Sequence, residues 1–251
     1  MFGNKMNKTY KTATSDFIKL IAILCMTGDH IAWAVFPGYS REPLAVALHI
    51  LGRITCPVMC YFIAEGFYHT RSVKKYALRL GVLTLVSHFA YKFYGGAASL
   101  ADFVPFRNGF LNQTSIIFAL LSGLLMLCAA KSEKINSPVL RAALIMASGV
   151  ISMCADWGCI ASFAVLFFGI NRGSFLRQAA SLAVLSAAFA AFFIYTSDLF
   201  YGVLQFSMLL ALPLLAAYSG KRSKNPRIGK IMKWAFYIYY PAHLFIIGLI
   251  K

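Results

Sequence analysis

The sequence predicts an all-α, polytopic integral membrane protein with about nine transmembrane helices. Of the 251 residues, 60% are hydrophobic and 13% are charged, whereas soluble domains average roughly 45–50% apolar and about 25% charged residues. The mean hydropathy is +0.70. The formal net charge of +16 does not indicate nucleic-acid binding, because the basic residues fall between long apolar runs. We therefore expect the lipid bilayer, and no nucleic acid, as a partner.

Nine apolar segments are candidate spans. A helix needs about 20 residues to cross the hydrocarbon core of a bilayer. The segment 158–170 is shorter, so a tilted, broken or re-entrant helix is an alternative there. The remaining residues are loops, and one transmembrane domain over residues 1–251 is expected. The segments are Asp16–Phe36, Leu44–Phe67, Lys75–Tyr94, Gln113–Ala130, Pro138–Cys154, Gly158–Ile170, Gln178–Ser197, Gly202–Tyr218 and Ile231–Ile250.

The lysine and arginine residues alternate along the chain. Eighteen lie in one set of alternate connections, and four lie in the other. Because basic loops stay in the cytoplasm, we expect a cytoplasmic N-terminus, an outside C-terminus and a multi-pass protein of the plasma or inner membrane. The larger set is Lys5, Lys8, Lys11, Arg71, Lys74, Lys75, Arg79, Lys131, Lys134, Arg141, Arg172, Arg177, Lys221, Arg222, Lys224, Arg227, Lys230 and Lys233.

Several ionisable side chains fall in the outer half of the predicted spans, where such residues are costly and usually functional. Asp29 and His30 are adjacent, so they point about 100° apart on a helix. We expect Asp29 to pair with Arg53 across helices, because a buried carboxylate needs a partner. His30 is then free to act as a base, and His243 is a second candidate base. His49 shares a helix face with Arg53, and one interpretation is that it only braces Arg53.

A second polar layer lies near the predicted cytoplasmic face. From Asp16 to His30 is about 21 Å along a helix, so most of the bilayer separates the two layers. This geometry would suit a long donor molecule held in the cytoplasm by its anionic end. The cysteines show no metal-ligand spacing, and no metal site is expected. The candidate donor-binding residues are Lys19, Glu65, Arg71, Lys74, Lys75 and Arg79.

Four stretches carry a resemblance to a known family. Residues 16–30 read D-F-I-K-L-I-A-I-L-C-M-T-G-D-H, and residues 51–76 read L-G-R-I-T-C-P-V-M-C-Y-F-I-A-E-G-F-Y-H-T-R-S-V-K-K-Y. Residues 156–158 read D-W-G, and residues 233–244 read K-W-A-F-Y-I-Y-Y-P-A-H-L. Together they resemble the TraX family, named for acetylation of F-pilin, over nearly the whole chain. For that family the resemblance implies acetylation of the N-terminal amine of pilin.

The first stretch also resembles the opening of the broader membrane acyltransferase 3 group, in which an Asp, a basic residue and a catalytic His recur. Asp16, Lys19 and His30 reproduce that spacing. The group usually has Arg where this chain has Lys19, and a lysine cannot make the same bidentate contact. This resemblance implies acyl transfer from cytoplasmic acyl-CoA, with acetyl-CoA as the expected donor.

The residues and the resemblance agree in predicting an acyltransferase. The basic residues from Arg71 to Arg79 would hold the CoA phosphates, and the pantetheine arm would pass Lys19 and Glu65. His30 would act as general base, and Arg53 would stabilise the oxyanion. The acceptor would be a peptide amine, a sugar or a small molecule. Two alternatives remain: a proton-coupled transporter and a non-catalytic membrane partner of a pilin-like protein.

Overall fold

The computed structural model describes residues 12–36, 38–104, 107, 109–223 and 226–251; the predicted basic residues Lys5, Lys8, Lys11 and Lys224 lie outside this part. In the described part all regular elements are helical, which confirms the predicted class. The elements are α1 (Ser15–Val35), α2 (Pro43–Gly52), α3 (Thr55–His69), α4 (Val73–Tyr94), the 3-10 helix η1 (Leu100–Phe103), α5 (Ile116–Lys131), α6 (Pro138–Ser152), α7 (Gly158–Ile170), α8 (Phe175–Thr196), α9 (Leu199–Leu204), the 3-10 helix η2 (Gln205–Leu210), α10 (Ala211–Ala216) and α11 (Pro226–Ile250).

The predicted spans coincide with helices, but two of them are interrupted. The span predicted at 44–67 is α2 followed by α3, with a break at Arg53 and Ile54. The span predicted at 202–218 consists of α9, η2 and α10. By length and composition, four stretches of the described chain could each cross a membrane; they are Ser15–Val35, Pro43–His69, Phe175–Thr196 and Leu199–Ala216. The total of nine crossings stays a prediction.

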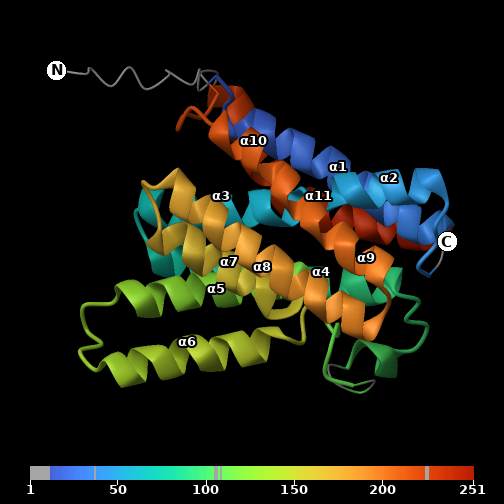
Figure 1. The fold of residues 1–251 in the computed structure, drawn as a ribbon, viewed down its shortest axis with the longest axis horizontal. Coiled ribbons are helices and arrows are strands. Elements are labelled where there is room, and N and C mark those ends of the chain that lie inside the picture. The colour runs from blue at the N-terminus through green and yellow to red at the C-terminus, as the bar shows by residue number, and fades with distance from the viewer. Residues whose placement is uncertain (1–11, 37, 105–106, 108, 224–225) are drawn as a thin grey trace.

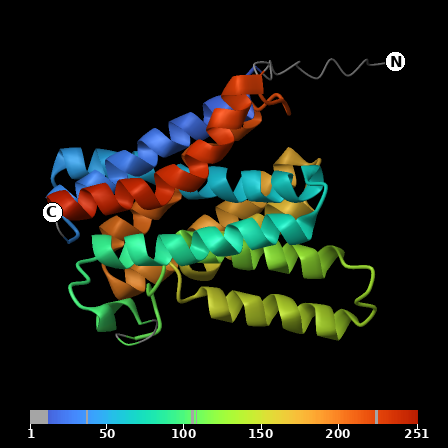
Figure 2. The ribbon, with the colours of Figure 1, turned by 180° about the vertical axis from the view of Figure 1, so that it is seen from behind.

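The connections of the bundle are sorted by charge. Figure 1 shows the α3–α4, α5–α6, α7–α8 and α10–α11 connections at the end of the bundle that also holds the start of α1. These connections carry the lysine and arginine excess, and we call this the basic end. The α1–α2 and α4–α5 connections lie at the opposite end, near the C-terminus (Figures 1 and 2). The sequence alternation therefore corresponds to two ends of one bundle.

Short polar side chains begin several of these helices by accepting a backbone N–H. Ser72 caps α4 by accepting from the Lys75 N–H at 3.3 Å. Asp198 caps α9 by accepting from the Tyr201 N–H at 2.7 Å. This bond and the Arg41 guanidinium at 2.9 Å hold the pKa of the Asp198 carboxyl below its usual range. The Arg41–Asp198 pair also ties the α1–α2 connection to the start of α9.

The core lies where α5 and α7 meet. Leu120, Leu124 and Phe168 are buried there. A Cβ at Gly123 would lie 2.8 Å from the Ser162 carbonyl oxygen, so glycine at this position permits the close approach of the two helices. The helix α6 packs on α5 and α7 at the edge of the bundle, as Figure 1 shows.

The functional candidates depend on the packing around α1. This helix lies against α2, α3 and α11, and α11 in turn lies against α4. The approach of α1 to α2 is tight at Gly52, where a Cβ would lie 2.4 Å from Cβ and 2.5 Å from Cγ of Asp29. A side chain at residue 52 would therefore push against the part of Asp29 nearest the backbone.

The orientation predicts the behaviour of reporter fusions. A reporter enzyme that is active only outside the cytoplasm should be inactive when fused after Ser137, in the basic α5–α6 connection. It should be active when fused after Gly96, just beyond the end of α4. The reverse pattern would contradict the predicted sidedness.

The packing at Gly52 predicts that Gly52→Ala lowers the free energy of unfolding. Overpacking of this kind costs about 1–3 kcal/mol. The matched control is Gly81→Ala in α4, where a Cβ would meet nothing within 4 Å. This substitution should leave the free energy of unfolding unchanged or raise it slightly. Thermal unfolding of the detergent-purified variants, followed by circular dichroism, measures both. Equal stability of the two variants would contradict the tight α1–α2 contact.

Candidate functional site

Near its end α1 carries two polar side chains that point to different neighbours. Asp29 faces α2 and α3, and His30 faces α4 and α11. This divergence follows from the helical rotation of about 100° per residue. The end of α1 therefore links two polar clusters.

Asp29 is held by two residues of the interrupted second crossing. Its Oδ1 lies 2.7 Å from His49 Nδ1, and its Oδ2 lies 3.5 Å from Arg53 Nη1. The expected pairing of Asp29 with Arg53 is thus present as an ion pair, while the nearer partner is His49. The interpretation that His49 only braces Arg53 is wrong, because its hydrogen bond goes to the carboxylate.

Arg53 is buried, with 5% of the residue exposed, and its guanidinium is held from three sides. Its Nε donates to Gln205 Oε1 at 3.0 Å, and the Gln205 amide donates to the Tyr201 carbonyl at 2.9 Å. Its Cζ lies 5.3 Å from the centre of the Trp157 ring. Nη1 is engaged in the Asp29 ion pair, and within the described residues Nη2 makes no hydrogen bond, so Arg53 keeps donors for a bound polar group. Sequence reasoning missed Gln205, although an amide inside an apolar run is a usable signal.

The backbone at the D-W-G stretch directs the Trp157 ring toward Arg53. Trp157 has φ +66° and Gly158 has φ +51°. A positive φ is uncommon for a bulky residue and is tolerated where the surrounding structure fixes it. The Trp157 ring also stacks with Phe189, with ring centres 5.2 Å apart. The turn therefore positions an aromatic face against the buried guanidinium.

His30 forms the second cluster with the last helix. Its Nδ1 lies 2.7 Å from Nε2 of His243, and the two rings are 24° from parallel. Tyr94 donates from its hydroxyl to the His30 carbonyl at 2.9 Å, and its ring centre lies 5.6 Å from that of His30. The His30 ring is half-buried among these groups. The contact with His243 therefore places a group of another helix at one nitrogen of His30.

Arg53 and His30 do not touch in the described structure. Arg53 contacts Gln205 and Asp29, whereas His30 contacts α11. The peptide bond between Asp29 and His30 joins the two clusters. The structure thus brings together Asp29 with Arg53 and His30 with His243, but not all four at contact distance.

The inner candidates have other neighbours than the sequence suggested. Lys19 Nζ lies 4.8 Å from the Phe62 ring centre and 5.4 Å from that of Phe236. Glu65 is paired with Arg172, with Oε1 at 2.7 Å from Nε and Oε2 at 3.3 Å from Nη2. Its Oε2 also lies 3.2 Å from His69 Nε2. The Glu65 carboxylate is therefore already neutralised by Arg172, and its expected place beside the pantetheine arm stays a prediction.

The basic residues from Arg71 to Arg79 lie at the start of α4. Arg71, Lys74, Lys75 and Arg79 are all exposed, and in the described part none of them forms an ion pair. Lys75 and Arg79 are four residues apart and share one face of the helix. This face offers two unpaired cations at the basic end.

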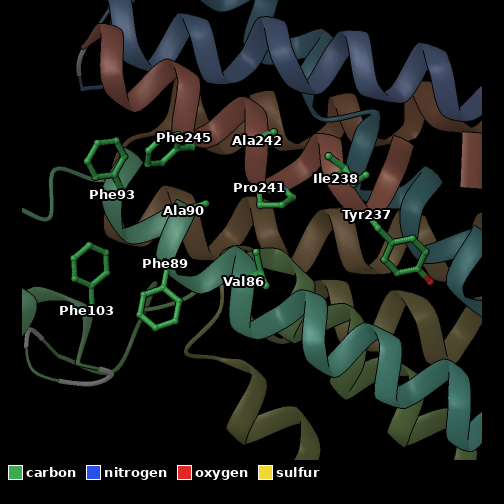
Figure 3. A pocket seen from close by; sticks show the side chains of 10 residues that line it. All are labelled: Val86, Phe89, Ala90, Phe93, Phe103, Tyr237, Ile238, Pro241, Ala242 and Phe245. Atoms are coloured by element: carbon green, nitrogen blue, oxygen red, sulfur yellow. The ribbon is translucent and has the colours of Figure 1, made fainter. Parts of the chain in front are cut away.

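Two grooves flank α11. One, of about 580 Å³, lies between α4 and α11, and Figure 3 shows it lined by Phe89 and Phe93 of α4, Pro241 and Phe245 of α11, and Phe103 of η1. The other, of about 470 Å³, lies between α1 and α11. Its walls are largely aliphatic, and His243 lies in them beside Thr27 and Tyr239.

The chain is similar to known proteins over most of its length. The family model described as TraX protein matches residues 14–251. A protein of Dichelobacter nodosus named "Probable fimbrial assembly protein FimC, serogroup H1" is 30% identical over 237 residues, which are 90% of this chain and 91% of that protein.

A second relative is an uncharacterized protein of Rickettsia prowazekii, 36% identical over 58 residues that cover 23% of this chain and 21% of that protein. No solved structure matches the chain. The match over residues 14–251 contains Asp29, Arg53, the D-W-G turn and the His30–His243 pair. On this evidence of length and position, the chain belongs to the TraX protein family.

Proposed function

We propose that this protein is an integral membrane acyltransferase that moves an acetyl group from cytoplasmic acetyl-CoA to an amine or hydroxyl acceptor. The observation that carries the proposal is the His30–His243 hydrogen bond, which fixes one nitrogen of His30 and leaves the other for proton transfer. The resemblance to the acyltransferase 3 group supports the same residue as the catalytic base. Arg53, buried with unused donors, supports the second role that acyl transfer requires.

The donor would bind from the basic end. The phosphates of CoA would pair with Lys75, Arg79, Lys74 and Arg71, since charge-assisted hydrogen bonds to phosphate are strong. The pantetheine arm would run past Lys19, whose aromatic surroundings leave its ammonium without an ion pair in the described part. In this proposal Glu65 does not contact the donor. Its role is indirect, because its ion pair holds Arg172 in place.

The chemistry is the addition and collapse of a thioester. His30 takes a proton from the acceptor nitrogen or oxygen as that atom attacks the thioester carbon. The resulting oxyanion would accept hydrogen bonds from Arg53 Nη. The C–S bond then breaks, and the proton on His30 passes to the departing CoA sulfur. In the alternative route, His30 itself attacks the thioester carbon and the C–S bond breaks to give an acyl-histidine; the acceptor then attacks this acyl group, and the bond to His30 breaks.

A pilin-like peptide amine is the favoured acceptor class. The relative from Dichelobacter nodosus is named for fimbrial assembly, and the TraX family is named for pilin acetylation. The fimbrial assembly name of the relative is also compatible with a second function, that of a non-catalytic membrane partner of a pilin-like protein. A sugar or a small amine would remain an acceptor of the same reaction. The proposed location is the plasma or inner membrane, and the long apolar helices support a membrane protein.

The proposal predicts that His30→Ala reduces acetyl transfer by at least about 10²-fold, because a general base contributes roughly 10²–10⁴-fold. The assay follows radiolabelled acetyl-CoA and a synthetic peptide with a free N-terminal amine, using full-length purified protein. His88→Ala is the matched control, since His88 bonds Thr114 and the Phe103 carbonyl rather than His30.

Full activity of His30→Ala would contradict the assignment. A wild-type protein that supports pilus assembly without CoA turnover, equally well with His30→Ala, would favour the non-catalytic partner. Substrate-gated proton flux without CoA turnover would favour a transporter.

The donor site predicts a selective effect of Lys75→Gln with Arg79→Gln. The double variant should raise KM for acetyl-CoA about 10-fold or more, because hydrogen bonds to charged groups contribute about 1.5–3 kcal/mol each, and kcat should change little. The matched control is Lys131→Gln with Lys134→Gln in another basic connection of the same end. Acetyl-pantetheine, which lacks the nucleotide phosphates, should be used equally by both variants; a KM effect on this substrate as well would contradict phosphate binding.

A further inference from the structure

The hydrogen bonds around His243 determine where the protons of both imidazoles must be. His243 Nδ1 lies 2.9 Å from the backbone carbonyl oxygen of Tyr239. A carbonyl oxygen can only accept, so His243 Nδ1 carries the hydrogen. In the neutral ring, Nε2 of His243 is then an acceptor.

The direction of the second bond follows from the first. His30 Nδ1 lies 2.7 Å from His243 Nε2, so in the neutral pair His30 Nδ1 must donate. This leaves the lone pair of His30 on Nε2. The chain of donors runs from His30 through His243 to the Tyr239 carbonyl, and both nitrogens of His243 are occupied.

The acceptor at the end of this chain is itself held in place. Thr27 donates its hydroxyl hydrogen to the Ile23 carbonyl at 2.9 Å. The Tyr239 hydroxyl, 2.7 Å from Thr27 Oγ1, must therefore be the donor in that contact. The Tyr239 ring is also nearly parallel to that of His243, at 8°, with centres 5.2 Å apart. These contacts fix the register of α11 against α1, and so fix His243 beside His30.

We infer that His243 is not a second base but the positioning residue that holds neutral His30 in the Nδ1–H form, with Nε2 as the catalytic base. The inference rests on the proposed function for its catalytic consequence only. When Nε2 of His30 takes the acceptor proton, the added charge is shared, because the Nδ1 hydrogen can move to Nε2 of His243 while the hydrogen bond persists. Departure of the proton to the CoA sulfur restores both rings. An imidazole partner can share the added proton in this way without placing a second carboxylate in the apolar bundle.

The first arm of the test reads the tautomers directly and needs no activity. Two-bond ¹H–¹⁵N spectra of the full-length, detergent-purified protein distinguish Nδ1–H from Nε2–H, and the variants His30→Gln and His243→Gln assign the signals. At a pH where both rings are neutral, we expect Nδ1–H on both. In His243→Ala the His30 signals should change to a mixture of tautomers. An Nε2–H form of His30 in the wild type, or an unchanged His30 tautomer in His243→Ala, would overturn the inference.

The second arm measures turnover of acetyl-CoA with the synthetic peptide amine. His243→Ala should lower kcat about 10- to 100-fold, within the range of general-base catalysis, with KM for acetyl-CoA within about twofold. His243→Gln should recover most of kcat, since its amide oxygen can accept from His30 Nδ1. The control His88→Ala should match the wild type.

The two arms fail separately. Loss of activity in His243→Gln as complete as in His30→Ala would make His243 a base in its own right and overturn the positioning role. Absence of turnover in the wild type would overturn the proposed function, and the tautomer spectra would still decide whether His243 orients His30.

Discussion

Asp29 is a carboxylate within an apolar bundle, and the bundle supplies two partners for it from the crossing formed by α2 and α3. An unpaired charge in such surroundings would cost several kcal/mol, so the place of Asp29 constrains how α1 meets its neighbours. Gly52 admits the carboxylate, and His49 and Arg53 hold it. With Asp29 directed to one side, the next residue is directed to the other, and His30 reaches α11.

Much of this arrangement follows from local patterns in the sequence. Apolar run length predicts the helices, charge alternation predicts which connections share an end, and the need of Asp29 for a cation predicts Arg53. The closer bond to His49 does not follow, because it depends on how α1 and α2 approach at Gly52. Neither does the Glu65–Arg172 pair, which joins residues 107 positions apart. Contacts of this kind are set by the packing of whole helices.

The two clusters at the end of α1 differ in the kind of control they exert. Around Arg53, an amide, a carboxylate and an aromatic face hold a permanent cation whose outer donors stay available. Around His30, the side-chain hydrogen bonds seen in the described residues run through His243 to a backbone carbonyl, both of them neutral groups. The pair can therefore gain one proton and lose it again without leaving an ion behind. In the proposed function, the fixed charge would stabilise the oxyanion, and the movable proton would serve general-base catalysis.

The His30–His243 contact joins residues 213 positions apart in the chain. During synthesis α1 emerges well before α11, so His30 spends this interval without the ring that orients it. Non-local contacts of this kind form late in folding. In the proposed function, the oriented base at His30 would accordingly form only once α11 has packed against α1, and a chain truncated before α11 would lack the His30–His243 hydrogen bond.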